Sequence, residues 1–229
     1  MTKEVPPKSC RGVRRGERLT NCDGDRRYAF TLIELVLVVG IITVLAALVL
    51  STVGYARKKG ALARAETEIA AIAAACENYK ADNAVYPRDN PTPGYTDALD
   101  AQENGDPTQS VYQNASLYLF TQLSGLNPQN PQPPISGARS YFSFKPQMLL
   151  KDTNGNVVAI KDPLGNSYGY STAYQAWADS SYSGDQKGYN PTFDVWSTAG
   201  LTGGQPTQAD QNQWIKNWFS KAGGADTER

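Results

Sequence analysis

The chain has 229 residues, and its 22 basic and 22 acidic side chains leave no formal net charge. It contains no histidine, the side chain that most often serves as a general base near neutral pH or as a metal ligand. This composition excludes Ser-His-Asp chemistry and argues against zinc hydrolases. The length allows one ordinary domain with accessory segments.

Residues 1–29 form a polar, basic leader. They hold eight basic and four acidic side chains, which leaves fourteen basic and eighteen acidic residues in the rest of the chain. The segment has no apolar periodicity, so we predict that it contributes nothing to a core. It also contains Cys10 and Cys22. If the leader is removed, Cys76 is the one remaining thiol and no intrachain disulfide can form.

An apolar run begins abruptly at Phe30. Between Phe30 and Val53 the only charged residue is Glu34. About 20 apolar residues in a helix, at ~1.5 Å each, cross a hydrocarbon core ~30 Å thick. The run is too long for a secretory signal peptide, and no Ala-x-Ala site closes it. We therefore predict that residues 30–53 span a membrane, with the basic leader on the cytoplasmic side. A buried core helix is the alternative.

The helix is predicted to continue beyond the membrane through residues 54–86. Strong helix formers fill this segment, and the helix should end near Asn83 because Tyr86-Pro87 cannot continue it. Arg64 and Glu68 are predicted on its solvent face. The opposite face carries an apolar stripe at helical spacing, formed by Leu62, Ile69, Ile72, Cys76 and Tyr79.

Residues 87–229 are predicted to form a globular head of short elements. Asn154-Gly155 between two apolar runs predicts a hairpin of strands 148–151 and 157–161. The other expected elements are an irregular loop at 88–110, a helix at 115–124, an extended linker at 127–134, strands near 168–170 and 193–196, and a helical turn at 211–219. The helix at 115–124 is predicted to place Leu117, Phe120 and Leu123 on one side. The predicted fold class is α+β, with a long N-terminal helix packed on a small antiparallel sheet.

The junction of leader and apolar run reads RRYAFTLIEL over residues 26–35. It resembles the processing site of type IV prepilins and pseudopilins, in which a basic leader and a small residue precede F-T-L-I-E-L. The resemblance implies that a prepilin peptidase cleaves between Ala29 and Phe30 and then methylates the new amino group of Phe30. Glycine is usual before the cut, and Ala29 is a small replacement.

Glu34 is the candidate assembly residue. A carboxylate at the edge of a membrane-spanning run costs several kcal/mol unless it is paired, and such residues are functional candidates. After the cleavage its natural partner is the positive amino terminus at Phe30 of a neighbouring subunit, and this pair would set the stagger between subunits. The alternative is a tolerated carboxylate near the membrane interface.

Later segments resemble the major pseudopilins of type II secretion systems. YKADNAVYP at 79–87 is similar to their helix exit, DPLGNSYGY at 162–170 to their D-P-W-G-N-x-Y turn, and FDVWSTAG at 193–200 to their Y-D-[IV]-[WF]-S stretch. Asn217-Trp218 is similar to their closing N-W. Asp162 is expected to cap or brace the turn. Residues 88–150 match nothing in this pattern. The lone Cys76 favours a pseudopilin over pilins that close a C-terminal disulfide.

The resemblance also implies a calcium site in the loop after Y-D-x-W-S. Calcium takes six to eight oxygen ligands, usually several from carboxylates. Here this loop is 201–210, and Asp210 is its one acidic residue. Asp210, Thr202 and backbone carbonyls are the candidate ligands. The oxygen-rich run at 152–156 lacks the spacing of an EF-hand and is better interpreted as the hairpin turn.

The expected function is structural rather than enzymatic. The resemblance implies a single-pass subunit of the bacterial inner membrane, with its head in the periplasm, that assembles into a helical homo-filament and drives protein export. The implied partners are the prepilin peptidase, minor pseudopilins, the inner-membrane secretion platform and membrane lipid; the acidic body predicts no nucleic acid. The alternatives are a type IV pilin for adhesion, motility or DNA uptake, and a membrane-anchored glycan-binding domain that uses tryptophans 177, 196, 214 and 218. We expect these tryptophans to form the core of the head instead.

Overall fold

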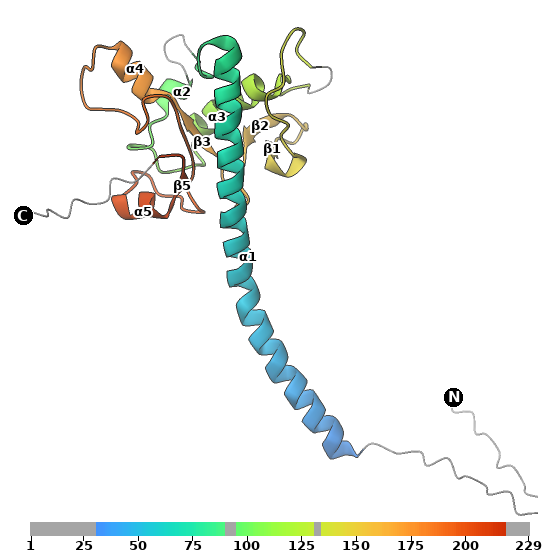
Figure 1. The fold of residues 1–229 in the computed structure, drawn as a ribbon. Helices are drawn as coiled ribbons and strands as arrows, with labels where there is room; N and C mark the ends of the chain where they lie inside the picture. The colour runs from blue at the N-terminus through green and yellow to red at the C-terminus, as the bar shows by residue number, and fades with distance from the viewer. Residues whose placement is uncertain (1–30, 90–94, 131–133, 219–229) are drawn as a thin grey trace, which may run out of the picture. The chain divides into compact units, whose positions relative to one another are not determined.

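A computed structural model describes residues 31–89, 95–130 and 134–218 (Figure 1). These residues form an α+β protein in which one long helix precedes short helices and two small antiparallel sheets. The helices are α1 (Leu32–Asn83), α2 (Tyr95–Ala98), α3 (Ser110–Ser124), α4 (Ala173–Asp179) and α5 (Gln208–Gln213), with a 3-10 turn at Pro146–Met148. The strands are β1 (Leu149–Lys151), β2 (Val157–Ile160), β3 (Gly169–Ser171), β4 (Asp194–Ser197) and β5 (Ile215–Lys216).

The chain divides into two compact units, with the boundary between Val49 and Leu50 inside α1. In the first unit every described residue is exposed. By length and composition α1 is the one helix in the described part of the chain that could span a membrane. The helix ends at Asn83, as predicted, because Ala84 takes a positive φ of 62° while its N–H donates to the Lys80 carbonyl at 2.8 Å.

In the second unit α1 packs on the head through the predicted apolar stripe. Ile69, Ile72 and Cys76 are buried in a core that includes Tyr168 and Tyr170. Leu62 and Tyr79 are half-buried at its edges. Alanines 65 and 75 complete the stripe, and their small side chains let the helix approach the head closely.

The prediction that Glu68 lies on the solvent face is wrong. The side chain of Glu68 is 11% exposed, accepts a hydrogen bond from the hydroxyl of Tyr168 at 2.8 Å, and pairs with Arg64 at 2.7 Å. A half-buried carboxylate is tolerated here because a hydroxyl and a guanidinium both satisfy it. Helical spacing alone could not indicate this, since the partner Tyr168 lies 100 residues away.

The first sheet is the predicted hairpin of β1 and β2, paired with Leu149 opposite Ile160. In its turn one carboxylate oxygen of Asp152 accepts the N–H groups of Asn154 and Asn156, both at 2.8 Å. Gly155 takes the positive φ of 87° that the turn requires. The interpretation of 152–156 as a hairpin turn is confirmed.

The second sheet has the order β3-β4-β5, with every pair antiparallel. Strands β3 and β4 confirm the strands predicted near 168–170 and 193–196. The helical turn predicted at 211–219 is wrong in part, because α5 ends at Gln213 and a strand follows. Asn217 explains the strand: its side chain accepts the N–H of Val195 at 2.9 Å and its own N–H donates to the Val195 carbonyl at 3.1 Å.

The segment predicted as an irregular loop at 88–110 is irregular in its described residues 88–89 and 99–109, and contains the short helix α2. The guanidinium of Arg88 pairs with Asp97 of α2 at 3.0 Å and with Asp179 of α4 at 2.6 Å. The segment also buries Leu99 completely. Two ion pairs therefore tie the exit of α1 to two short helices whose sequences carry little helical signal of their own.

Helix α3 begins at Ser110, five residues before its predicted start, and ends at Ser124 as predicted. Phe120 and Leu123 are buried as expected, but Leu119 is fully buried whereas Leu117 is only half-buried. The face that α3 presents to the core is thus rotated from the one predicted. Apolar side chains contact α3 on both sides, so the spacing of its own apolar residues does not determine how the helix is rotated about its axis.

A second apolar cluster is built from indoles. Trp196 is fully buried, stacks on Trp214 with ring centroids 6.1 Å apart, and donates its N–H to the hydroxyl of Tyr112 at 3.1 Å. Trp218 packs against Trp196 edge-on at 5.7 Å. The expectation that the tryptophans form core is confirmed for these three.

Gly169 provides the first test of this packing. A Cβ on Gly169 would overlap the indole ring of Trp196 on the facing strand. We expect Gly169→Ala to lower the free energy of unfolding by about 1–3 kcal/mol through overpacking. Denaturant unfolding followed by tryptophan fluorescence measures the change. Gly203→Ala, where a Cβ meets open space, is the matched control and should leave stability within about 0.5 kcal/mol.

Asp194 provides a test by pH. Its carboxylate accepts the N–H groups of Tyr189 at 2.7 Å and Asn190 at 2.9 Å, but burial raises its pKa to about 7. The folded state then keeps a proton that the unfolded chain releases near pH ~4. This contribution to stability is full below that pH and is lost, on the order of 4 kcal/mol, as pH rises through 7. The unfolding free energy of the wild type minus that of Asp194→Asn should therefore fall by about 4 kcal/mol between pH ~4 and 7. The exposed Asp185→Asn is the control, and an unchanged difference for Asp194→Asn would contradict the prediction.

Candidate functional site

The start of α1 is organised by Thr31 and Glu34. One oxygen of the Glu34 carboxylate accepts from the N–H of Thr31 at 2.9 Å and from its hydroxyl at 2.8 Å. In return the N–H of Glu34 donates to the Thr31 hydroxyl oxygen at 3.3 Å. This reciprocal pair is a capping box, which satisfies N–H groups that the first helical turn leaves without partners.

The capping box gives Glu34 a role that the membrane argument missed. The spacing Thr-x-x-Glu ahead of an apolar run is a sequence signature of a helix start, and it could have been recognised from residues 31–34. In the single chain the carboxylate is exposed, and one of its oxygens accepts two hydrogen bonds from Thr31. Ala29 and Phe30 lie outside the described residues, so the predicted cleavage and the pairing of Glu34 with the Phe30 amino group stay predictions.

Beyond the capping box, α1 presents apolar side chains in every direction. Fourteen large aliphatic residues between Leu32 and Leu50 are 49–80% exposed. Full burial of such a side chain is worth about 1.5–3 kcal/mol. Scaled by their exposed fractions, covering all fourteen would contribute on the order of 13–26 kcal/mol. This is as large as the whole stability of an ordinary domain, roughly 5–15 kcal/mol, or larger. This surface therefore requires a covering of lipid or of protein.

The D-P-x-G-N block is structural, as predicted. One carboxylate oxygen of Asp162 accepts the N–H groups of Leu164 and Asn166, both at 2.9 Å, and the other accepts the hydroxyl of Ser197 at 2.5 Å. Burial raises the pKa of Asp162, and these hydrogen bonds oppose that rise. The residue braces the turn against β4 and has no free oxygen directed to solvent for catalysis.

The predicted calcium loop surrounds a hollow of about 270 Å³. Asp210 lies in its wall, together with Thr202. One oxygen of Asp210 already accepts from the Thr207 N–H at 3.0 Å and hydroxyl at 2.7 Å, in the capping box of α5. Within the described residues no group of three acidic or cysteine side chains could hold a metal. The donor set is one carboxylate and loop carbonyls, which is poor for calcium.

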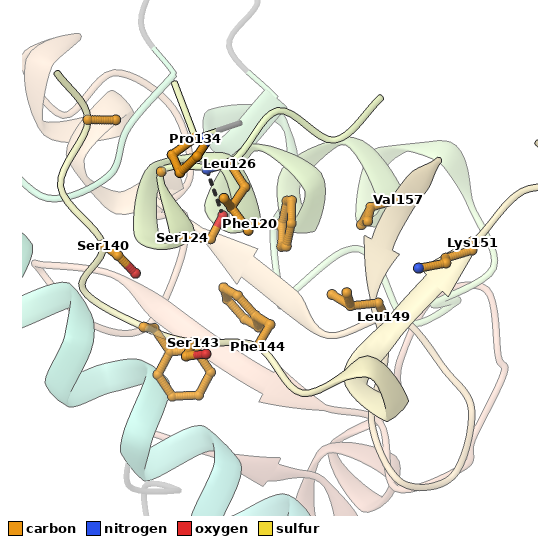
Figure 2. Close-up of a pocket in the computed structure, with 13 residues that line it drawn as sticks. Phe120, Ser124, Leu126, Pro134, Ser140, Ser143, Phe144, Leu149, Lys151 and Val157 are labelled. Carbon is orange, nitrogen blue, oxygen red and sulfur yellow. Dashed lines mark hydrogen bonds between the residues drawn. The ribbon is translucent and has the colours of Figure 1, made fainter. Parts of the chain in front are cut away.

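A second hollow, of about 290 Å³, opens between the end of α3, residues 134–144 and the β1–β2 hairpin (Figure 2). Its walls are mainly apolar, and Figure 2 shows Phe144 and Leu149 facing it, with Lys151 at one end. Lys151 is the one ionisable side chain among the described residues that line it. The hollow has no nucleophile paired with a base and so offers no catalytic arrangement.

One tryptophan does not belong to the core. Trp177 on α4 is half-buried and contacts Tyr182 edge-on at 4.8 Å, with Tyr174 at 5.4 Å on the same patch. Tyr182 is 60% exposed and takes a positive φ of 59°, which is unusual for a bulky residue. This is the aromatic surface that a sugar ring could contact.

Comparison of the chain with protein-family models, with curated proteins and with solved structures found no match in any of the three. The residues themselves show an exposed apolar helix, a capped glutamate at its start, and a folded α+β head on the same helix.

Calcium at Asp210 is tested directly by metal addition and removal. A site in this loop predicts that millimolar calcium raises the Tm of the chelator-treated protein, and that Asp210→Asn abolishes the rise. Asp152→Asn, which alters the hairpin turn instead, is the control and should keep the calcium response. No response in the wild type would show that the single carboxylate is insufficient.

Proposed function

We propose that this chain is a structural subunit of a type IV pilin-like filament, most similar to the major pseudopilin of a type II secretion system. The observation that carries the proposal is the exposed apolar stretch of α1, which opens with Thr31 and Glu34 and continues into a folded head. A helix that needs a covering and carries its own soluble domain suits a subunit that exchanges lipid for copies of itself.

The exchange is physically reasonable because one apolar surface serves both environments. Lipid chains and neighbouring aliphatic side chains are about equally apolar, so moving from the bilayer into a helical bundle costs little transfer free energy. Close packing and paired polar groups can then favour the helical bundle over the bilayer. Glu34 is the charged group in the described part of this stretch, and it is the natural candidate for that pairing.

Cleavage before Phe30 would supply the partner. It removes the basic leader and creates a positive amino group four positions before Glu34. In the single chain Thr31 satisfies the carboxylate, so assembly would exchange a capping interaction for an ion pair and would never leave a bare charge in hydrocarbon. We infer that the capping box holds Glu34 in the membrane until a neighbouring amino terminus replaces Thr31.

The remaining parts of the proposal follow from the resemblance. The subunit would lie in the bacterial inner membrane as a single-pass protein with its head in the periplasm, processed by a prepilin peptidase. Minor pseudopilins and the inner-membrane platform would nucleate and extend the filament, whose growth pushes exported protein outward. The subunit itself performs no chemistry in this scheme and needs no nucleic acid.

Two alternatives remain. A type IV pilin for adhesion, motility or DNA uptake shares the helix and the processing, and the lone Cys76 disfavours it. A membrane-anchored glycan-binding domain is favoured only by the patch of Tyr174, Trp177 and Tyr182. Saturable binding of oligosaccharides that is lost in Trp177→Ala would support the glycan-binding domain over the filament subunit.

The decisive experiment is mass spectrometry of the membrane-extracted protein after coexpression with a prepilin peptidase. We expect a product that starts at methylated Phe30. Glu34→Ala should be processed normally but assemble about tenfold less or worse, because the amino terminus loses its partner. Thr31→Ala removes the cap but not the carboxylate, so it should assemble better than Glu34→Ala. An intact leader would contradict the proposal.

A further inference from the structure

The head carries opposite charge on opposite sides. Figure 1 shows α2 and α4 on one side of α1 and the β1–β2 hairpin on the other. All of these elements belong to the second compact unit. The ionisable side chains of the two sides differ in sign, although the chain as a whole is neutral.

The basic flank is the hairpin with the segment that leads into it, residues 134–161. Its basic residues are Arg139, Lys145, Lys151 and Lys161, against the single carboxylate of Asp152. Four minus one leaves a charge of +3. Asp152 caps the hairpin turn, and Arg139 pairs with Asp82 of α1 at 2.5 Å. Among the described residues of this flank, the basic side chains without an ion pair are therefore Lys145, Lys151 and Lys161. Lys145 and Lys151 are both exposed.

The acidic flank comprises residues 88–89, 95–106 and 173–187. Besides the buried Asp100, it has six carboxylates and two basic residues, which leaves a charge of −4; the carboxylates are Asp89, Asp97, Glu103, Asp106, Asp179 and Asp185. These segments form one surface. Arg88 pairs with Asp179, Gln102 donates to the Gly188 carbonyl at 2.6 Å, and Lys187 lies 3.9 Å from Glu103.

We propose that the basic flank of one head docks against the acidic flank of the next copy in the filament. This inference rests on the proposed function, since it needs a filament of identical subunits. A contact between two different surfaces of the same chain is heterologous and builds an open helical array when the rotation does not close. Complementary electrostatic potentials fix the register of the contact, whereas two flanks of like charge repel each other.

The charge pattern favours a second copy over a foreign partner. The two flanks have nearly equal and opposite charge, so a row of copies cancels both at once. A polyanion would use only the basic flank and would leave the acidic one without a role. The ion pairs within the acidic flank also keep it rigid, so little ordering cost is added when it docks.

The test is a charge swap in the full chain, coexpressed with the prepilin peptidase. Lys145→Glu with Lys151→Glu reverses the basic flank, and Glu103→Lys with Asp185→Lys reverses the acidic flank. None of the four side chains has a hydrogen bond in the described structure, and the one ion pair among them is the 3.9 Å contact of Glu103, so the folds should survive. Tryptophan fluorescence checks this.

We expect each reversed pair to lower the yield of sedimentable filament about tenfold at low salt, and the quadruple variant to recover to within about threefold of the wild type. Salt near 0.5 M should weaken the differences. Zero-length carbodiimide crosslinking of wild-type filaments should join Lys145 or Lys151 to Glu103 or Asp185 between copies. Recovery in the quadruple variant is the result that a merely structural effect would not produce.

Loss of filament without recovery in the quadruple variant would overturn the docking model, as would a loss confined to the basic flank, which would indicate a polyanion instead. Processing at Phe30 is measured in the same samples. If processing is normal and the yield of filament is unchanged in both charge-reversed variants, the contact between flanks is wrong but the filament function stands. An unprocessed wild type without filaments would overturn the filament function and the contact together.

Discussion

The rest of the molecule depends on one constraint: the first part of α1 cannot remain in contact with water. From Leu32 to Leu50 large aliphatic side chains are exposed on all faces, with Glu34 as the charged exception. A soluble helix would keep one polar face, because one apolar stripe is enough to bind a core. A helix that is apolar all round needs a neighbour all round, and a bilayer or a bundle of copies provides it.

The head depends on the same helix in a different way. Past Val53 the apolar surface narrows to the stripe of Ile69, Ile72 and Cys76, which the head covers. The hydrogen bond from Tyr168 to Glu68 acts together with this packing to set the rotation of the helix, because a half-buried carboxylate needs a partner. The first part of α1 thus exposes its apolar surface, whereas the later part buries its apolar stripe against the head of the same chain.

Much of this could be predicted from local pattern. The end of α1, the β1–β2 hairpin and strands β3 and β4 are encoded in Pro87, in Asn154-Gly155 and in short apolar runs. The errors fall where distant residues decide. Asn217 pairs with Val195 and so places a strand at residues 215–216, where a helical turn was predicted. Tyr168 contacts Glu68, which was predicted on the solvent face. Nothing close in sequence indicates these partners. The spacing of Thr31 and Glu34, in contrast, is enough to predict the capping box from the sequence alone.

In the proposed filament subunit, the capped carboxylate of Glu34 would suit a helix that has to leave the membrane. A bare charge would hold the helix start in the headgroup region and resist burial, whereas an apolar residue would give assembly no polar contact to favour one register. A carboxylate that already accepts two hydrogen bonds from Thr31 has its desolvation partly compensated before it meets a neighbour. In the proposed assembly, the ion pair with an incoming amino terminus would then add a register-specific term to a transfer that is otherwise nearly neutral. Local capping would lower the cost of burying the carboxylate, and the charge of the neighbour would favour one register.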